Sequence, residues 1–121
     1  MAISRVKSMV HTPVTCSCSV RYGLWTDGTG DPGGSRMLPE GIVSQCAGHS
    51  GHTDPDTLDA AIKRENRALN DARVAAWGAG AVIAGWTIDS NRAVVVTVRG
   101  ATEALRQHLG RIDNLLPVYE G

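Results

Sequence analysis

The chain has 121 residues and a mass of 12.8 kDa, the size of a single domain with one hydrophobic core. Twelve Lys and Arg residues balance twelve Asp and Glu residues, and this neutral charge argues against a protein that coats nucleic acid or an anionic membrane surface. Hydrophobic residues make up 42% of the chain, which is enough to bury a core and to exclude disorder over the whole length.

The sequence carries no sign of membrane insertion or secretion. It has no run of about 18–20 apolar residues, the length of a membrane-spanning helix. Residues 1–7 lack the apolar core of a secretory signal peptide. The three cysteines are an odd number and would make a poor disulfide framework for a small secreted protein. We therefore expect a cytoplasmic protein or a component of a virion.

The N-terminal residues 1–13 include basic residues and no acidic ones. We interpret this segment as an arm that is either solvated or docked on a neighbouring subunit or an acidic surface. Residues 14–22 then alternate strictly, with apolar or cysteine side chains at the even positions and polar ones at the odd positions. This period of two predicts a half-buried β-strand, the first of the fold.

Residues 23–53 have no hydrophobic periodicity and are rich in glycine. At about 30 residues, this segment is much longer than the usual connection between two elements. Long loops of this kind are either functional or loosely ordered. We therefore predict a long loop inserted after the first strand, and we expect it to carry the functional residues.

A long helix is predicted next. Asp54 can cap it, and Pro55 suits its first position. Gly78 and Gly80 are expected to end it, with Trp77 packed on the last turn. Its apolar stripe consists of Leu58, Ala61, Ile62, Leu69, Ala72 and Ala76.

The remaining elements are short. Residues 81–88 and 93–99 are apolar and flank a polar turn, a pattern that predicts a β-hairpin. Residues 101–112 keep helical spacing, with Thr102 in position to cap the helix. Residues 115–119 predict a closing strand at a sheet edge, because the strand contains a proline.

The order of these elements is strand, long loop, helix, strand, strand, helix, strand. It indicates an α+β fold, a ferredoxin-like βαββαβ sandwich in which two helices cover a four-stranded antiparallel sheet. We expect residues 14–121 to form this single domain. The fold hosts many unrelated functions, so it says nothing about activity.

Candidate metal ligands are concentrated in one part of the chain. Cys46, His49 and His52 are spaced three residues apart in a glycine-rich stretch, which would let their side chains converge on one zinc ion. Cys16 or Cys18 could supply the fourth ligand. In a regular strand these two cysteines lie about 7 Å apart, whereas two thiolates on one zinc ion lie about 3.7 Å apart. A strand would therefore offer one of the two.

Other interpretations of these residues stay open. The cysteines could be small core residues with no metal, or they could form a disulfide or a reactive thiol. Cys46 with His49 or His52 could act as a nucleophile and its base, or an open metal site could activate water.

The sequence brings no complete catalytic set together. We therefore predict a non-catalytic interaction or assembly module, such as a structural subunit of a virion or another large complex, with a structural zinc site. Its expected partners are proteins, either further copies of the chain or other subunits, and not nucleic acid or membrane. The alternative is a small metal- or cysteine-dependent enzyme centred on Cys46, His49 and His52. A third possibility is a regulatory or inhibitor domain that docks by its sheet edge, which predicts an exposed strand and no metal or catalytic site.

Overall fold

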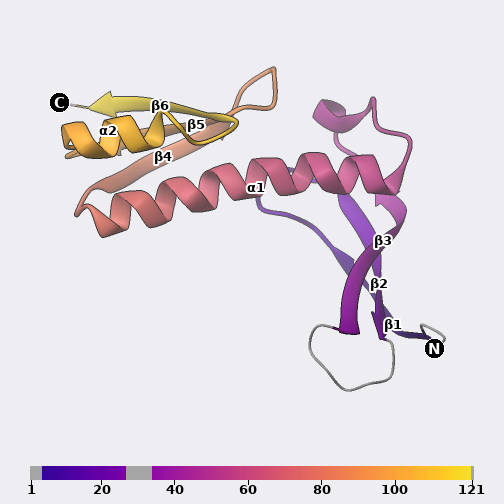
Figure 1. Cartoon of the computed structure of the whole chain (residues 1–121). Helices are drawn as coiled ribbons and strands as arrows, with labels where there is room; N and C mark the ends of the chain where they lie inside the picture. The colour runs from indigo at the N-terminus through magenta and orange to yellow at the C-terminus, as the bar shows by residue number, and fades with distance from the viewer. Residues whose placement is uncertain (1–3, 27–33, 121) are drawn as a thin grey trace. The chain divides into compact units, whose positions relative to one another are not determined.

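The computed structural model describes residues 4–26 and 34–120, and the chain divides into two compact units, Met1–Ile62 and Lys63–Gly121. We call them the N-terminal unit and the C-terminal unit. Each contains a three-stranded sheet, and the long helix α1 (Pro55–Gly78) begins in the first unit and ends in the second (Figure 1). The α+β class expected from the sequence is confirmed.

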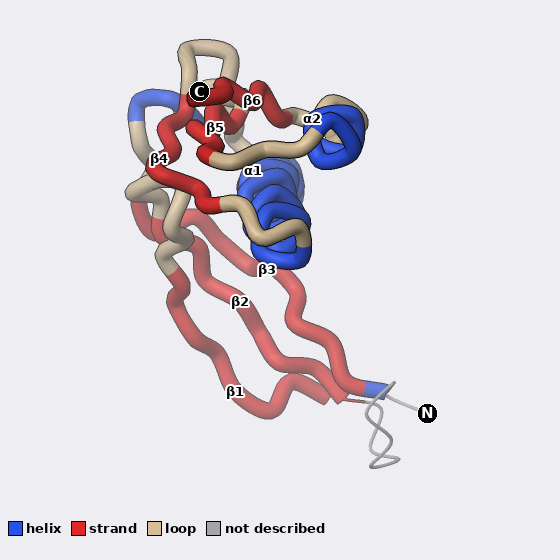
Figure 2. The backbone as a smooth tube through the Cα atoms, turned by 90° about the vertical axis from the view of Figure 1, so that its left-hand side faces the viewer, coloured by secondary structure: helices blue, strands red, loops and turns tan. Residues whose placement is uncertain are grey.

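The sheet of the N-terminal unit is antiparallel. Its middle strand is β2 (Ser19–Thr26), which pairs with β1 (Ser4–His11) on one side and with β3 (Ser35–Ser44) on the other (Figure 2). Every residue of β1 is exposed. Among the three strands, the fully buried residues therefore lie on the middle one.

The core of the N-terminal unit is small. Val20 of β2 packs with Leu58 and Ile62 from the first turns of α1, and Cys18 completes this group of buried side chains. Cys16, Tyr22, Ile42 and Cys46 are partly buried against it. Two of the three cysteines thus lie beside the core and the third lies within it.

This sheet differs from the sequence expectation. Residues 4–11 of the expected arm form β1, and residues 35–44 of the expected loop form β3. Because β1 and β2 are antiparallel neighbours, the chain must reverse between them. Residues 12–18 make that connection, so the strand predicted from residue 14 begins at Ser19 instead.

Parts of the expected arm and loop, residues 1–3 and 27–33, lie outside the described residues. The single domain over residues 14–121 stays a prediction, although that range spans parts of both compact units.

The C-terminal unit contains the elements that the sequence predicted for it. The strands β4 (Val82–Ile88) and β5 (Val94–Arg99) form the hairpin, and α2 (Glu103–Leu109) leads to β6 (Leu115–Glu120). The sheet order is β4-β5-β6, and β5 and β6 are parallel. α2 is therefore a crossover between two neighbouring parallel strands.

Both helices contribute to one core in the C-terminal unit. The alternate side chains of β5 that point toward the helices are fully buried, as expected for a strand covered on one face. The buried cluster consists of Ala68, Leu69, Ala72, Ala76, Ala81, Val94, Val96, Val98, Leu105, Leu109 and Leu115.

The structure does not have the ferredoxin-like sandwich that the sequence predicted. The described strands form two three-stranded sheets rather than one four-stranded antiparallel sheet. A split βαβ arrangement needs another strand between the two strands that a helix connects. Here β5 and β6 pair directly, which leaves no place between them, and the N-terminal strands pair in their own sheet.

The ends of α1 follow the sequence expectation. A side-chain oxygen of Asp54 accepts a hydrogen bond from the backbone N–H of Asp56 (3.0 Å), and Pro55 is the first helical residue. Beyond the last turn, Gly80 has φ of 73°, a left-handed conformation that suits glycine. Trp77, however, is 86% exposed and does not pack on the last turn. Within residues 4–26 and 34–120, no helix has the length and apolar character needed to cross a membrane.

The start of α2 supports a first prediction. The Thr102 hydroxyl accepts a hydrogen bond from the backbone N–H of Leu105 (3.2 Å). Replacing Thr102 with Ala should lower the free energy of unfolding by about 1 kcal/mol, because that N–H loses its cap. Urea denaturation would measure this as a lower midpoint with an unchanged slope. Thr102→Ser keeps the hydroxyl and should unfold close to wild type; an equal loss in both variants would contradict the capping role.

Candidate metal centre

Three cysteines and one histidine converge at one end of the N-terminal sheet. Cys16 and Cys18 lie in the connection between β1 and β2, and Cys46 and His49 follow β3. Pairing of Ser19 with Ser44 brings these two segments together although they are far apart in the sequence. Antiparallel pairing of β2 with β3 is therefore what positions the site.

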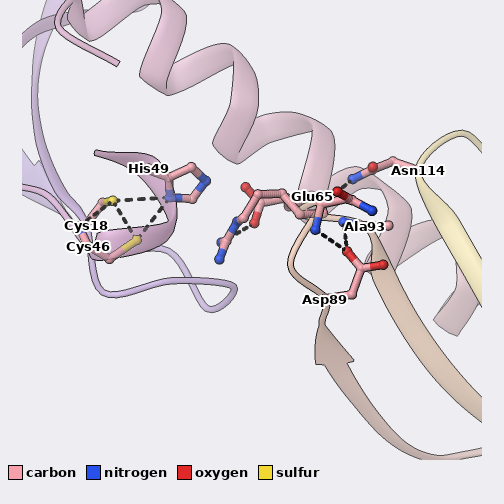
Figure 3. A network of polar contacts seen from close by, with 9 residues as sticks. Cys18, Cys46, His49, Glu65, Asp89, Ala93 and Asn114 are labelled. Atoms are coloured by element: carbon pink, nitrogen blue, oxygen red, sulfur yellow. Dashed lines mark hydrogen bonds and ion pairs between the residues drawn. The ribbon is translucent and has the colours of Figure 1, made fainter. Parts of the chain in front are cut away.

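The donor atoms are close to one another. The sulfurs of Cys18 and Cys46 are 3.4 Å apart, and Nδ1 of His49 lies 3.4 Å from the first and 3.2 Å from the second. Figure 3 shows the His49 ring with Nδ1 directed at both sulfurs. With the Cys16 sulfur, all four atoms lie within 4.8 Å of one another.

These separations fit a tetrahedral metal ion better than a covalent bond. Zinc with Zn–S bonds of about 2.3 Å and Zn–N bonds of about 2.0 Å places neighbouring sulfurs about 3.7 Å apart and sulfur and nitrogen about 3.5 Å apart. The three distances among Cys18, Cys46 and His49 are shorter than these values by about 0.1 to 0.3 Å. A disulfide would need about 2.05 Å between sulfurs, and all three cysteines are free thiols. The group formed by Cys16, Cys18, Cys46 and His49 could hold a metal ion.

The site is partly shielded from water and held by backbone hydrogen bonds. Cys18 is fully buried, and His49 is 1% exposed. The backbone N–H of Cys46 donates to the Cys18 sulfur (3.2 Å), an interaction that stabilises a thiolate. Cys46 also begins the short 3-10 helix Ala47–His49, where its carbonyl accepts from the N–H of His49 (3.1 Å).

Gln45 braces the segment that carries His49. Its side-chain amide donates to the backbone carbonyl of His49 and to that of His52 (2.6 Å for the latter). These two bonds tie the short helix to the turn that follows it. Gln45 thus fixes the backbone from which the His49 ring projects.

Electrostatics at the site disfavour thiolates when no cation is present. The pKa of Cys16 is raised to about 12, mainly by burial and to a lesser extent by the neighbouring cysteines, while a backbone hydrogen bond at Cys18 opposes the rise. Burial likewise raises the pKa of Cys18. A divalent cation reverses this balance, because its charge stabilises the deprotonated sulfur atoms.

A tyrosine and an aspartate pack beside the cluster. The Tyr22 hydroxyl donates to a carboxylate oxygen of Asp59 (2.6 Å), and Asp59 is buried in the first turns of α1. Burial and the Asp59 carboxylate raise the pKa of the Tyr22 hydroxyl. This bond links β2 to α1 next to the cysteines.

The structure brings four of the five expected ligands together and leaves one out. It brings Cys16 and Cys18 into the same group, where a strand would have allowed one of them, because both lie in the irregular connection before β2, on either side of a bend at Ser17. The group does not include His52, whose ring centroid lies 6.0 Å from that of His49. Sequence reasoning missed Gln45 and the Tyr22–Asp59 bond. No local pattern marks them, since their partners are backbone carbonyls or distant residues.

Comparison with family models, curated proteins and solved structures found no match to this chain.

Proposed function

We propose that the chain is a non-catalytic assembly module whose N-terminal unit is organised by a structural zinc ion bound to Cys16, Cys18, Cys46 and His49. The observation that carries the proposal is the convergence of four zinc-type donors within 4.8 Å beside the core of that unit. Three sulfur donors and one imidazole donor suit zinc better than magnesium or calcium, which prefer oxygen ligands.

The closed donor set favours a structural role over a catalytic one. Catalytic zinc sites keep three protein ligands and an open position for water, whereas structural sites use four protein ligands. Four donors are present here, and two of them are almost fully buried. The enzyme alternative relied on Cys46, His49 and His52, and His52 does not belong to this group.

The small core of the N-terminal unit indicates why a structural ion would be needed for its stability. The hydrophobic cluster of the N-terminal unit contains four buried residues among those that the structure describes. Units of about 60 residues bury a smaller share of their surface than larger domains do and are marginally stable without a disulfide, a metal or a partner. A zinc ion that links the β1–β2 connection to the segment after β3 would supply such a cross-link.

The exposed apolar side chains support the assembly part of the proposal. Several exposed residues of both sheets are large and hydrophobic, as is typical of surfaces that meet other proteins. In the N-terminal sheet these are Val6, Met9, Val10, Met37, Leu38 and Val43, and in the C-terminal sheet they are Val82, Leu116 and Val118.

Metal content tests the zinc proposal directly. Protein purified without chelator should contain one zinc ion per chain. Cobalt substituted for zinc should give the absorption bands of a tetrahedral thiolate-bound ion. Less than stoichiometric zinc after metal-free protein is refilled with Zn²⁺, or the weak bands of an octahedral cobalt ion, would overturn the proposal.

Gln45 supports a second prediction. Removing its amide with Gln45→Ala should weaken zinc binding by about 10-fold, the lower end of what loss of an outer hydrogen-bond partner usually causes. Competition with a chromophoric chelator would measure the affinity. Gln107, on α2 of the C-terminal unit, provides the matched control, and Gln107→Ala should leave the zinc affinity unchanged. Equal affinities for Gln45→Ala and wild type would show that the short helix holds His49 without this brace.

A further inference from the structure

The sulfur donors of the candidate metal centre differ in their access to solvent. Cys18 is fully buried, whereas Cys46 is partly exposed. Their sulfur atoms are 3.4 Å apart and form one side of the triangle of contacts drawn in Figure 3. In such an arrangement a small oxidant reaches the exposed sulfur first, and the buried sulfur beside it can then complete a disulfide. The cluster therefore contains a thiol pair suited to reversible oxidation.

Backbone contacts hold these two cysteines side by side. Ser19 pairs with Ser44 in the sheet, one residue beyond Cys18 and two before Cys46. The backbone N–H of Cys46 also donates to the Cys18 sulfur (3.2 Å). A disulfide bond is about 2.05 Å long, so the two sulfurs need to approach each other by about 1.3 Å. A small rotation of each side chain supplies this shift, and the strand pairing next to the site can stay as it is.

Cys16 is a poorer disulfide partner for Cys18 than Cys46 is. A bond between Cys16 and Cys18 would close a ring across a single residue, Ser17, and so short a ring forces the bond into strained geometry. Strained disulfides are reduced more easily than relaxed ones. Cys18 and Cys46 are 28 positions apart in the sequence, so their bond is free of this constraint. We therefore expect Cys16 to keep its thiol when the other two are oxidised.

We propose that Cys18 and Cys46 form a peroxide-sensitive pair whose oxidation to a disulfide releases the zinc ion from the N-terminal unit. The inference deepens the zinc proposal and rests on it, because the released ion is the one bound by the four donors. Once two donors are joined, only Cys16 and His49 remain, whereas a structural zinc site uses four protein ligands. The new bond joins the same two segments as the ion, the β1–β2 connection and the segment after β3. The unit thus keeps a cross-link when it loses zinc.

The oxidation takes two steps, with hydrogen peroxide as the oxidant. The Cys46 thiolate attacks one peroxide oxygen, so that a sulfur–oxygen bond forms, the oxygen–oxygen bond breaks, and the leaving hydroxide takes a proton to become water. The Cys18 thiolate then attacks the sulfur of the Cys46 sulfenic acid. The disulfide bond forms, the sulfur–oxygen bond breaks, and a second hydroxide takes a proton and leaves as water. The two thiolates together lose two electrons, which one molecule of peroxide accepts.

Peroxide treatment of the zinc-loaded full chain tests the proposal. Metal analysis after desalting should show the loss of about one zinc ion per chain, and the mass of the chain should fall by about 2 Da, the two thiol hydrogens. After the remaining thiols are labelled with iodoacetamide, trypsin gives residues 8–21, with Cys16 and Cys18, and residues 37–63, with Cys46. These two peptides should be linked, with the label on Cys16. Dithiothreitol should separate them, and added zinc should then bind to the reduced chain again.

The unfolded chain is the matched control, because it has the same thiols without the native contacts. In urea and a chelator, the same treatment should give a mixture of pairings. His52→Ala changes an imidazole outside the donor group, so it should release zinc and link the peptides as wild type does. Zinc that stays bound under peroxide overturns the proposal, and so does a native disulfide to Cys16 or a native mixture like that of the unfolded chain. Zinc content measured before peroxide is added separates these outcomes from a failure of the zinc proposal.

Discussion

Replacing Cys46 with Ser should abolish stoichiometric zinc binding and unfold the N-terminal unit. Cys46 contributes a sulfur to the donor group and also donates its backbone N–H to the Cys18 sulfur. Structural zinc is worth about 10–16 kcal/mol in small zinc-dependent domains, far more than a core of four buried residues can replace. Even a loss of about 3 kcal/mol would lower the melting temperature of a unit this size by about 12 °C or more.

Two measurements on the full chain would establish this result. Metal analysis gives the zinc content, and amide hydrogen exchange followed by fragment locates the loss of structure. Exchange should become fast in β2 and β3 of the variant. The amides of β5, in the C-terminal unit, should keep their protection.

His52→Ala is the matched control for Cys46→Ser. It removes a nearby imidazole that lies outside the donor group, so the variant should bind one zinc ion and unfold as wild type does. Loss of zinc in His52→Ala would contradict the ligand set. Unchanged zinc content and unchanged melting of Cys46→Ser would show that the cysteines are ordinary core residues.

Replacing Arg92 with Ala should lower the free energy of unfolding by roughly 3 kcal/mol. Arg92 lies in the turn between β4 and β5, where its guanidinium pairs with the carboxylate of Glu65 on α1. The Glu65 side chain is 2% exposed and that of Arg92 is 28% exposed. Removing the arginine leaves a buried carboxylate without its main opposite charge, which is strongly destabilising.

The two halves of this ion pair should respond differently. Glu65→Gln keeps the shape and a hydrogen-bonding oxygen, and the remaining guanidinium can reach water, so we expect a loss of about 1 to 2 kcal/mol. Arg92 also has φ of 63°, which glycine tolerates better than alanine. Arg92→Gly should therefore be more stable than Arg92→Ala, although both lack the ion pair.

Urea denaturation of these variants, read at one wavelength and repeated at another to check two-state behaviour, gives the comparison. The pair between Arg64 and Asp113 is a suitable control, because its side chains are 59% and 75% exposed. Arg64→Ala should leave the unfolding midpoint close to that of wild type. An equal effect of Arg64→Ala and Arg92→Ala would contradict the importance of burial.

Local patterns were sufficient for the C-terminal unit and for α1. Asp54 and Pro55 start the helix, and the residues of its predicted apolar stripe are buried apart from the partly buried Ala61. The buried face also includes Asp59, Glu65 and Ala68, which the stripe did not contain. The hairpin, α2 and β6 also lie where periodicity predicts them. In these elements, apolar residues face the core and polar residues face water. They therefore recur at the spacing of a helix or a strand, which can be recognised directly in the sequence.

The N-terminal sheet could not be predicted in this way. β1 is exposed on both faces, so no alternation of apolar and polar residues reveals it. β3 contains Pro39 and Gly41, and its register against β2 is irregular near them. Both strands exist because they pair with β2, and pairing between distant segments leaves little trace in a short window of sequence.

In the candidate site, too, some features follow from the local sequence and others from the pairing of distant segments. The sequence by itself determined which donors are available, a Cys-x-Cys pair and a Cys-x-x-His pair, and that they are chemically suited to zinc. Tertiary structure decided how they combine. Because β1 and β2 are antiparallel, residues 12–18 must turn, and a turn can bring the sulfurs of Cys16 and Cys18 together where an extended strand holds them apart. Because β2 pairs with β3, that turn meets the segment carrying Cys46 and His49, and the short helix after Cys46 brings His49, rather than His52, into the group.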